Sequence, residues 1–177
     1  MLCPKLETSR LILRRYSEND IDAFMEIIHD ERLQLYIQFP DLSYEEELKY
    51  IKDCASKADV DKFEKWSIVL KDSGDVIGNI SINTVNRRHN YCNVGYVIRY
   101  DYWGNGYAAE ALKVVSDYLL DSGYYLVECS CNELNTQSSR VMEKAGFTRD
   151  GYISNRRLNK DGSYSGVVFY GKVKDDK

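Results

Sequence analysis

The chain has 177 residues, of which 44% are apolar and 29% are charged, an ordinary mix for a folded domain. Its formal net charge of −4 argues against a pervasive nucleic-acid-binding surface, and no apolar run approaches the roughly 20 residues that span a membrane. The opening Met1–Lys5 leads into charged sequence and not into an apolar signal core. Five cysteines, none in a Cys-x-x-Cys pair, favour a reducing compartment. We therefore expect a single cytoplasmic domain over residues 1–177.

The first sixty residues contain one strand pattern and two helix starts. The segment Arg10–Tyr16 predicts a short strand. Ser17 with Asp20, and Ser43 with Glu46, have the spacing of capping boxes, which begin helices. The apolar positions that continue these helices are Ile21, Phe24, Met25 and Ile28 in the first, and Leu48, Ile51, Ala55 and Ala58 in the second.

Strands dominate the remainder of the chain. Apolar runs bounded by turn residues predict strands at Trp66–Leu70, Val76–Ile82, Tyr91–Tyr100, Tyr125–Cys131, Thr148–Leu158 and Tyr164–Val173. Two helices interrupt them, one directly after Gly106 and one from about Thr136 to Ala145, which Gly146 ends. Because the helix after Gly106 is a crossover and must join parallel strands, we expect a mixed α/β sheet.

The sharpest feature is the loop Trp103–Ala108, in which Gly104 and Gly106 separate a strand from a helix. First-turn helix amides have no intrahelical acceptors, and glycines let a phosphate approach the backbone, so the loop is interpreted as a pyrophosphate site. A tight turn that binds nothing is the plain alternative. The spacing Gly104-x-Gly106-x-x-Ala109 also satisfies the dinucleotide fingerprint, with Glu128 near its ribose-ligand position. We disfavour that reading because only one further strand–helix unit follows the loop.

Several motifs occur in a fixed order along the chain. They are Leu6–Arg14, Val76–Gly78, Val94–Ile98, Trp103–Ala111 and Asn135–Phe147. Together they resemble the GNAT superfamily of acyl-CoA N-acyltransferases, and most closely its RimJ/RimL-like branch. The resemblance covers nearly the whole chain. It implies a single-domain α/β fold with a mixed, mostly antiparallel sheet, a central parallel strand pair splayed around CoA, and about four helices.

The resemblance also implies acetyl-CoA as co-substrate, held between the splayed strands, and no metal. Backbone groups of Tyr96, Val97 and Ile98 are expected to pair with the pantetheine arm as an added strand would. Asn135 matches a position whose side-chain amide reaches that arm, with helix capping as its alternative role. Arg140 is expected either to meet a CoA phosphate or to be solvated. The loop positions expected to hold the pyrophosphate are Trp103, Gly104, Asn105, Gly106, Tyr107 and Ala108.

The chain departs from the family pattern where protons are transferred. Family members often carry Tyr four residues before the last motif glycine, whereas Met142 stands here and has no proton to donate. Ser138 matches a branch position proposed to protonate the CoA thiolate, and a capping or packing role is its alternative. A strand position that is often Glu is Asn93, which cannot act as a base. His29 and His89 are expected at the surface.

We interpret the chain as an acetyl-CoA-dependent N-acetyltransferase that moves an acetyl group to a primary amine by direct attack in a ternary complex. The acceptor stays open between a protein N-terminus, a polyamine and another small amine. By analogy with the family, residues 36–44 are expected to wall its site, with core packing as the alternative role of their aromatic side chains. A non-catalytic CoA-binding sensor or partner module is the alternative, which Met142 and Asn93 favour. Neither nucleic acid nor membrane is an expected partner, and a homodimer is compatible with the resemblance.

Overall fold

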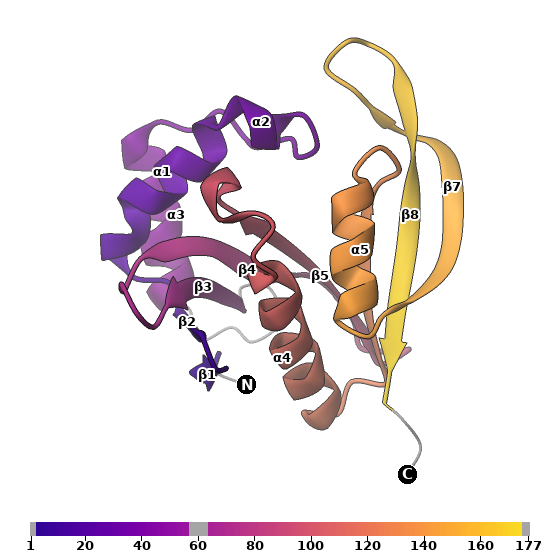
Figure 1. The fold of residues 1–177 in the computed structure, drawn as a ribbon, viewed down its shortest axis with the longest axis horizontal. Helices are drawn as coiled ribbons and strands as arrows, with labels where there is room; N and C mark the ends of the chain where they lie inside the picture. Colours follow the sequence, from indigo (N-terminus) through magenta and orange to yellow (C-terminus); the bar gives the residue numbers. More distant parts are fainter. Residues whose placement is uncertain (1–2, 57–63, 175–177) are drawn as a thin grey trace.

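The structure, a computed structural model, describes residues 3–56 and 64–174. Within these ranges, eight strands form one sheet in the order β1-β2-β3-β4-β5-β6-β8-β7 (Figure 1). The strands are β1 (Leu6–Glu7), β2 (Leu11–Arg15), β3 (Lys65–Leu70), β4 (Val76–Asn86), β5 (Tyr91–Ile98), β6 (Leu126–Asn132), β7 (Thr148–Leu158) and β8 (Tyr164–Val173). Every neighbouring pair is antiparallel except β5 and β6, which confirms the predicted mixed sheet.

Helices cover both faces of this sheet. The described residues form α1 (Ile21–His29), α2 (Glu31–Gln34), α3 (Tyr44–Ser56), α4 (Tyr107–Asp121) and α5 (Thr136–Lys144), with 3-10 helices at Glu18–Asp20 and Tyr100–Tyr102. α1 contacts α3 and β4, whereas α4 contacts β5, β6 and α5 (Figure 1). The fifth helix, α2, exceeds the predicted four. It is a single turn in which only Leu33 is buried, so it leaves no periodic pattern in the sequence.

Both predicted capping boxes are present. The Asp20 carboxylate accepts the Ser17 amide at 2.9 Å, and the Ser17 hydroxyl accepts the amide of Asn19. At the second box, the Glu46 carboxylate accepts the amide and the hydroxyl of Ser43, both at 2.9 Å. The chain therefore enters these helices where the spacing predicted. Helix α3 is described as far as Ser56, so the predicted position Ala58 lies outside the described residues.

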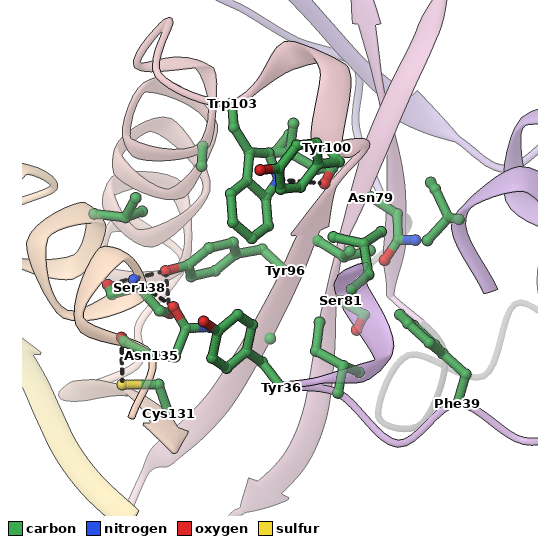
Figure 2. Close-up of a pocket in the computed structure, with 18 of the residues that line it drawn as sticks. Tyr36, Phe39, Asn79, Ser81, Tyr96, Tyr100, Trp103, Cys131, Asn135 and Ser138 are labelled. Atoms are coloured by element: carbon green, nitrogen blue, oxygen red, sulfur yellow. Dashed lines mark hydrogen bonds between the residues drawn. The ribbon is translucent and has the colours of Figure 1, made fainter. Parts of the chain in front are cut away.

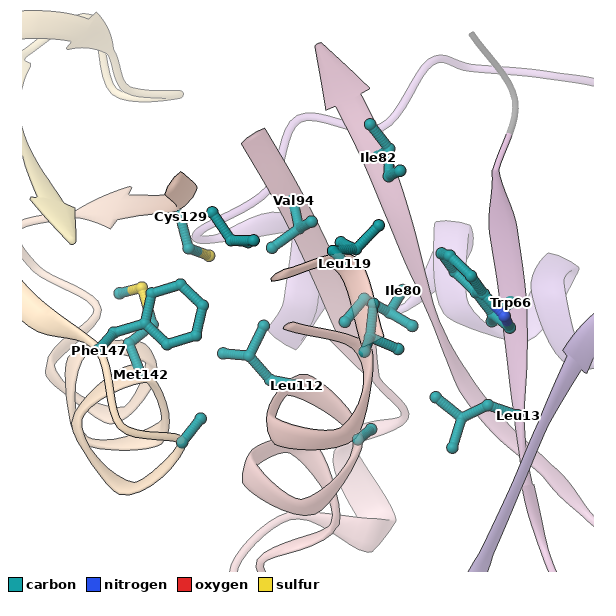
Figure 3. Packing of buried hydrophobic residues seen from close by; sticks show 14 of the residues in the cluster. Leu13, Trp66, Ile80, Ile82, Val94, Leu112, Leu119, Cys129, Met142 and Phe147 are labelled. Carbon is teal, nitrogen blue, oxygen red and sulfur yellow. The ribbon is translucent and has the colours of Figure 1, made fainter. Parts of the chain in front are cut away.

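Two apolar clusters lie on opposite faces of the sheet. The larger, under α4 and α5, includes Leu13, Trp66, Ile80, Val94, Leu112, Met142 and Phe147 (Figure 3). The smaller, under α1 and α3, includes Tyr16, Phe24, Ile27, Leu33, Ile51 and Val97. Side chains alternate along a strand, so Tyr96 and Val97 of β5 serve opposite faces.

The five cysteines are free and buried. Across the described ranges, no helix combines the length and the apolar character that a membrane span requires.

Candidate functional site

A cavity of about 1230 Å³ runs through the middle of the described structure. Strands β4, β5 and β6, the loop before α4 and helix α5 line one part of it, and the segments from α1 to α3 line the other (Figure 2). Sites for a single small ligand usually enclose about 300–1,000 Å³. The cavity therefore has room for a long ligand and a second, smaller one.

The gap between β5 and β6 opens into this cavity. The two strands pair only where Tyr91–Asn93 meets Leu126–Glu128, although they continue to Ile98 and Asn132. Beyond the paired residues, their outer edges stay bonded to β4 and β8 while the edges that face each other part. The gap is thus the splayed parallel pair that the resemblance implies.

Alternation along β5 decides which backbone groups face this gap. The Arg99 amide donates to the Ile77 carbonyl at the β4 side, at 2.8 Å. In an antiparallel ladder this direction repeats every second residue, so Val97 also turns its N–H and C=O to β4. The backbone groups of Tyr96 and Ile98 then face the gap. Of the three predicted strand residues, Tyr96 and Ile98 offer backbone groups to a ligand, whereas Val97 offers its side chain.

The loop before α4 presents a row of amides to the cavity. Gly104 and Gly106 have φ of +80° and +81°, in the left-handed region that favours glycine. Among the described residues, no amide from Gly104 to Ala108 donates to a backbone carbonyl. Helix α4 begins at Tyr107 without a side-chain cap, so the positive end of its dipole is open. A phosphate group fits this arrangement of donors.

Two predicted loop residues are partly engaged within the protein. The Trp103 amide donates to the Tyr100 carbonyl at 3.0 Å, and its indole N–H donates to the Ile98 carbonyl at 2.8 Å. The Asn105 side chain donates to the carbonyls of Tyr102 and Trp103, both at 3.1 Å, and it does not line the cavity. The Trp103 ring does line the cavity (Figure 2), whereas the Asn105 side chain closes the loop.

The turn between β1 and β2 holds this loop in place through contacts that the sequence motifs did not predict. Arg10 donates to the Asn105 carbonyl at 3.0 Å and to the Glu110 carboxylate at 2.7 Å, and its guanidinium lies 4.5 Å from the Tyr107 ring centroid. The Thr8 hydroxyl also donates to Glu110, at 2.5 Å. Thr8, Arg10 and Glu110 all belong to the quoted motifs, so the signal was present, but only the fold shows that they meet.

Across the gap, α5 brings Asn135 and Ser138 together with Tyr96 (Figure 2). The Asn135 side-chain oxygen accepts the Ser138 amide at 3.0 Å, which is a helix cap. The Tyr96 hydroxyl lies 2.7 Å from the Ser138 hydroxyl and donates to the Ser138 carbonyl at 3.2 Å. Burial raises the pKa of Tyr96 well above its ordinary value, so the phenol stays protonated. Two hydroxyls in contact at the cavity wall can hold and move a proton.

The other candidates divide between the cavity, the core and the surface. Arg140 is exposed on α5 and lines the cavity. Met142 is fully buried in the larger core cluster, where it packs and donates nothing. His29 and His89 are exposed and lie outside the cavity lining, as expected of surface histidines.

The part of the cavity away from the loop is lined by residues from Tyr36 to Leu42 and by polar side chains of β4. The Ser81 hydroxyl donates to the Asn83 side-chain oxygen at 3.1 Å, and the Asn83 amide donates to the Asn93 side-chain oxygen at 3.4 Å. These hydrogen-bonded side chains are all neutral, so they can position water but cannot act as a strong base. In the part of the protein that the structure describes, no cluster of three His, Cys, Asp or Glu side chains could hold a metal ion.

Comparison with known proteins identifies related sequences. The family model described as acetyltransferase (GNAT) domain matches residues 10–148. The uncharacterised N-acetyltransferase YnaD of Bacillus subtilis is 30% identical over 149 residues, which cover 84% of this chain and 85% of YnaD.

Solved structures share the fold. The ribosomal-protein acetyltransferase RimL in complex with coenzyme A superposes with a TM-score of 0.84 at 19% identity, covering 98% of this chain and all of RimL. The microcin C7 self-immunity acetyltransferase MccE, in complex with acetyl-CoA and AMP, gives 0.82 at 17% identity and covers 94% of each chain. Since the family model spans most of the chain and YnaD is 30% identical across more than two thirds of it, this protein belongs to the GNAT family of N-acetyltransferases.

Proposed function

We propose that this protein transfers the acetyl group of acetyl-CoA to a primary amine by direct attack in a ternary complex. The observation that carries the proposal is one cavity that joins the amide-lined loop before α4 to the open gap between β5 and β6. Membership of the GNAT family supports this reaction, and RimL and MccE were solved with CoA and acetyl-CoA, respectively.

Acetyl-CoA suits the cavity from the loop to the gap. The amides of the segment Gly104–Ala108 would hold its pyrophosphate, with Arg140 available to a phosphate at the cavity wall. The free edge groups of Tyr96 would pair with the pantetheine amides, as an added strand pairs with a sheet edge. The Ile98 carbonyl already accepts the Trp103 indole N–H, so Ile98 keeps only its amide for the ligand. Asn135 uses its side-chain oxygen in the cap, so its amide nitrogen keeps two hydrogens for a ligand.

The transfer forms a C–N bond and breaks a C–S bond, so the sulfur leaves as a thiolate and the attacking amine loses a proton. The Ile98 amide faces the gap and would polarise the thioester carbonyl. Ser138 would protonate or stabilise the thiolate, and the Tyr96 phenol, 2.7 Å away, would hold that hydroxyl in place. The amine proton would leave through water, which the neutral β4 side chains can position.

Two thiols line the cavity, and their chemistry favours direct attack over a covalent acetyl-enzyme. Burial raises the pKa of Cys129 to about 12, and it also raises the pKa of Cys131. Both thiols therefore stay protonated near neutral pH, and the thiol is a poor nucleophile compared with the thiolate.

The proposal leaves two classes of acceptor open, a protein N-terminus and a small amine. The naming of RimL as a ribosomal-protein acetyltransferase supports the first. The partly enclosed, aromatic cavity wall between Tyr36 and Leu42 supports the second.

A thiol-release assay with acetyl-CoA and a panel of primary amines and peptide N-termini tests the proposal. We expect at least one acceptor to accelerate release of the CoA thiol, with one acetylated amine formed for each thiol released. A protein that binds acetyl-CoA but releases no thiol with any acceptor would instead be a CoA-binding module.

A further inference from the structure

Glu47, in the first turn of α3, places a buried carboxylate in the cavity wall away from the loop. The residue is only 6% exposed, yet it lines the same cavity as the loop before α4. The buried Asp20 shows how this protein satisfies such a group, because its carboxylate accepts hydrogen bonds from Arg14, Ser67 and the Ser17 amide. Within the described residues, the Glu47 carboxylate has no hydrogen-bond donor. Among the described residues no fully buried side-chain oxygen lacks a hydrogen-bond partner, so the Glu47 carboxylate opens into the cavity, where a cationic group can reach it.

Burial raises the pKa of Glu47, and the positive charge of Lys65 offsets this rise only in part. Lys65 of β3 is the cation that acts on it, but the described residues show no salt bridge between the two within 4.0 Å. The Lys65 ammonium lies instead 5.4 Å from the ring centroid of Tyr50. Tyr16, Tyr50 and Cys54 complete the surroundings, and burial raises the pKa of each, so all three are neutral. A carboxylate among neutral aromatic rings suits a cationic ligand.

Strand register places Lys65, the cation that acts on Glu47, two strands away from the gap. Lys65 pairs with Ser81 of β4, which in turn pairs with Gly95 of β5. Neighbouring strands are about 4.8 Å apart, so Lys65 begins roughly 10 Å from the strand that borders the gap. The groups on which Glu47 acts are Tyr16 after β2, Tyr50 and Cys54 of α3, and Lys65 of β3, and none of them belongs to β5. Glu47 therefore faces a part of the acceptor other than the attacking nitrogen.

We propose that Glu47 binds a second positive charge on the acceptor, so that the preferred substrates are diamines and longer polyamines. This inference rests on the proposed acetyl transfer and names its substrate class. One amino group would enter the gap as the nucleophile, while a second, still protonated, would meet Glu47. A simple monoamine would leave the buried carboxylate unpaired and would bind more weakly.

Calorimetric titration of amines onto the CoA-saturated protein tests the assignment without requiring turnover. The probes are putrescine, spermidine and the monoamine butylamine. We expect the parent protein to bind at least one of the two polyamines about tenfold or more tightly than butylamine, as one charge-assisted hydrogen bond would provide. Glu47→Gln should abolish this preference while leaving CoA affinity unchanged. Glu45→Gln, an exposed neighbour in the same helical turn, is the matched control and should keep the preference.

Two results would overturn the role of Glu47. One is a parent protein that binds all three amines alike, and the other is a Glu47→Gln variant that retains the preference. Either would leave the proposed function standing if thiol release still occurs with some acceptor. Conversely, a protein that binds spermidine through Glu47 but never releases thiol would refute the proposed function and retain the binding site.

Discussion

Replacing Gly106 with Val tests whether the loop before α4 binds phosphate, provided that the backbone strain from a side chain at this position is controlled for. Gly106 has φ of +81°, where a β-branched residue is strained by about 1–3 kcal/mol. A Cβ built at this position meets only the Arg10 guanidinium, at 3.6 Å, which is an ordinary contact. For 177 residues, unfolding entropy amounts to about 0.37 kcal/mol per kelvin, so this strain lowers Tm by about 3–8 °C. The variant should therefore fold.

Gly74→Val supplies the matched control for that strain. Gly74 has φ of +79° in the turn between β3 and β4, and a Cβ there meets nothing within 4 Å. Both variants should lose similar stability, but only Gly106→Val puts an isopropyl group beside the amides that face the phosphate. A charge-assisted hydrogen bond contributes about 1.5–3 kcal/mol, so we expect its CoA affinity to fall more than about tenfold. Calorimetric titration below both melting temperatures measures this, and equal CoA affinity in the two variants would refute the assignment of the loop as a pyrophosphate site.

Four further predictions concern the site and the residues that support it. Asn135→Ala should lower Tm by about 3 °C through the lost cap and should also weaken CoA binding; a lower Tm with unchanged affinity would leave only the cap. Ser138→Ala should reduce kcat by about 10²-fold with little change in CoA affinity, and Tyr96→Phe should reduce kcat by less. Because Tyr96 acts through Ser138, the double variant should have the kcat of Ser138→Ala. A Ser138→Ala kcat within about twofold of the parent value contradicts the proton-donor role. Iodoacetamide should alkylate Cys131 faster as pH rises, because burial raises the pKa of the thiol and the thiolate is the form that reacts. Saturating CoA should block this alkylation, as mapped by peptide mass spectrometry, and undiminished labelling argues against a ligand in the gap. Burial raises the pKa of Asp20, but hydrogen bonds to the carboxylate outweigh burial and hold the pKa below its ordinary value. The stability that Asp20 contributes is therefore complete above about pH 4 and is lost as pH falls through the pKa of the folded state. Asp20→Asn should therefore lower the free energy of unfolding by about 3 kcal/mol at pH 7 and flatten the acid limb of a denaturation series; an unchanged acid limb contradicts this.

Local rules account for most of the fold that could be predicted. The capping boxes at Ser17 and Ser43, the glycine at residue 146 and the strand–turn patterns act over a few residues, so they are legible in the sequence. Helix α2 was missed because one turn with a single buried residue leaves no period. The splay of β5 and β6 followed from the family resemblance and not from any pattern within the two strands.

The site was less predictable wherever it depends on tertiary contact. Tyr96 and Ser138 are 42 residues apart, and no spacing rule brings their hydroxyls together. That the backbone of Val97 turns to β4 follows from strand register, which the sequence pattern does not specify. Glu47 ends a run of three glutamates, and only its burial in the fold distinguishes it from its exposed neighbours. Motifs therefore named Tyr96 and Ser138 as candidates, whereas the contact between their hydroxyls and the burial of Glu47 are visible only in the fold.

The central claim is that the gap between β5 and β6, together with the loop before α4, holds acetyl-CoA for transfer. A crystal structure of the acetyl-CoA complex tests it most directly. The account predicts the pyrophosphate against the amides of Gly104–Ala108 and the pantetheine arm bonded to the edge groups of Tyr96. It also predicts the thioester carbonyl at the Ile98 amide and the thioester sulfur within hydrogen-bond reach of the Ser138 hydroxyl. A pantetheine arm that lies outside the gap, or a sulfur remote from Ser138, would contradict it.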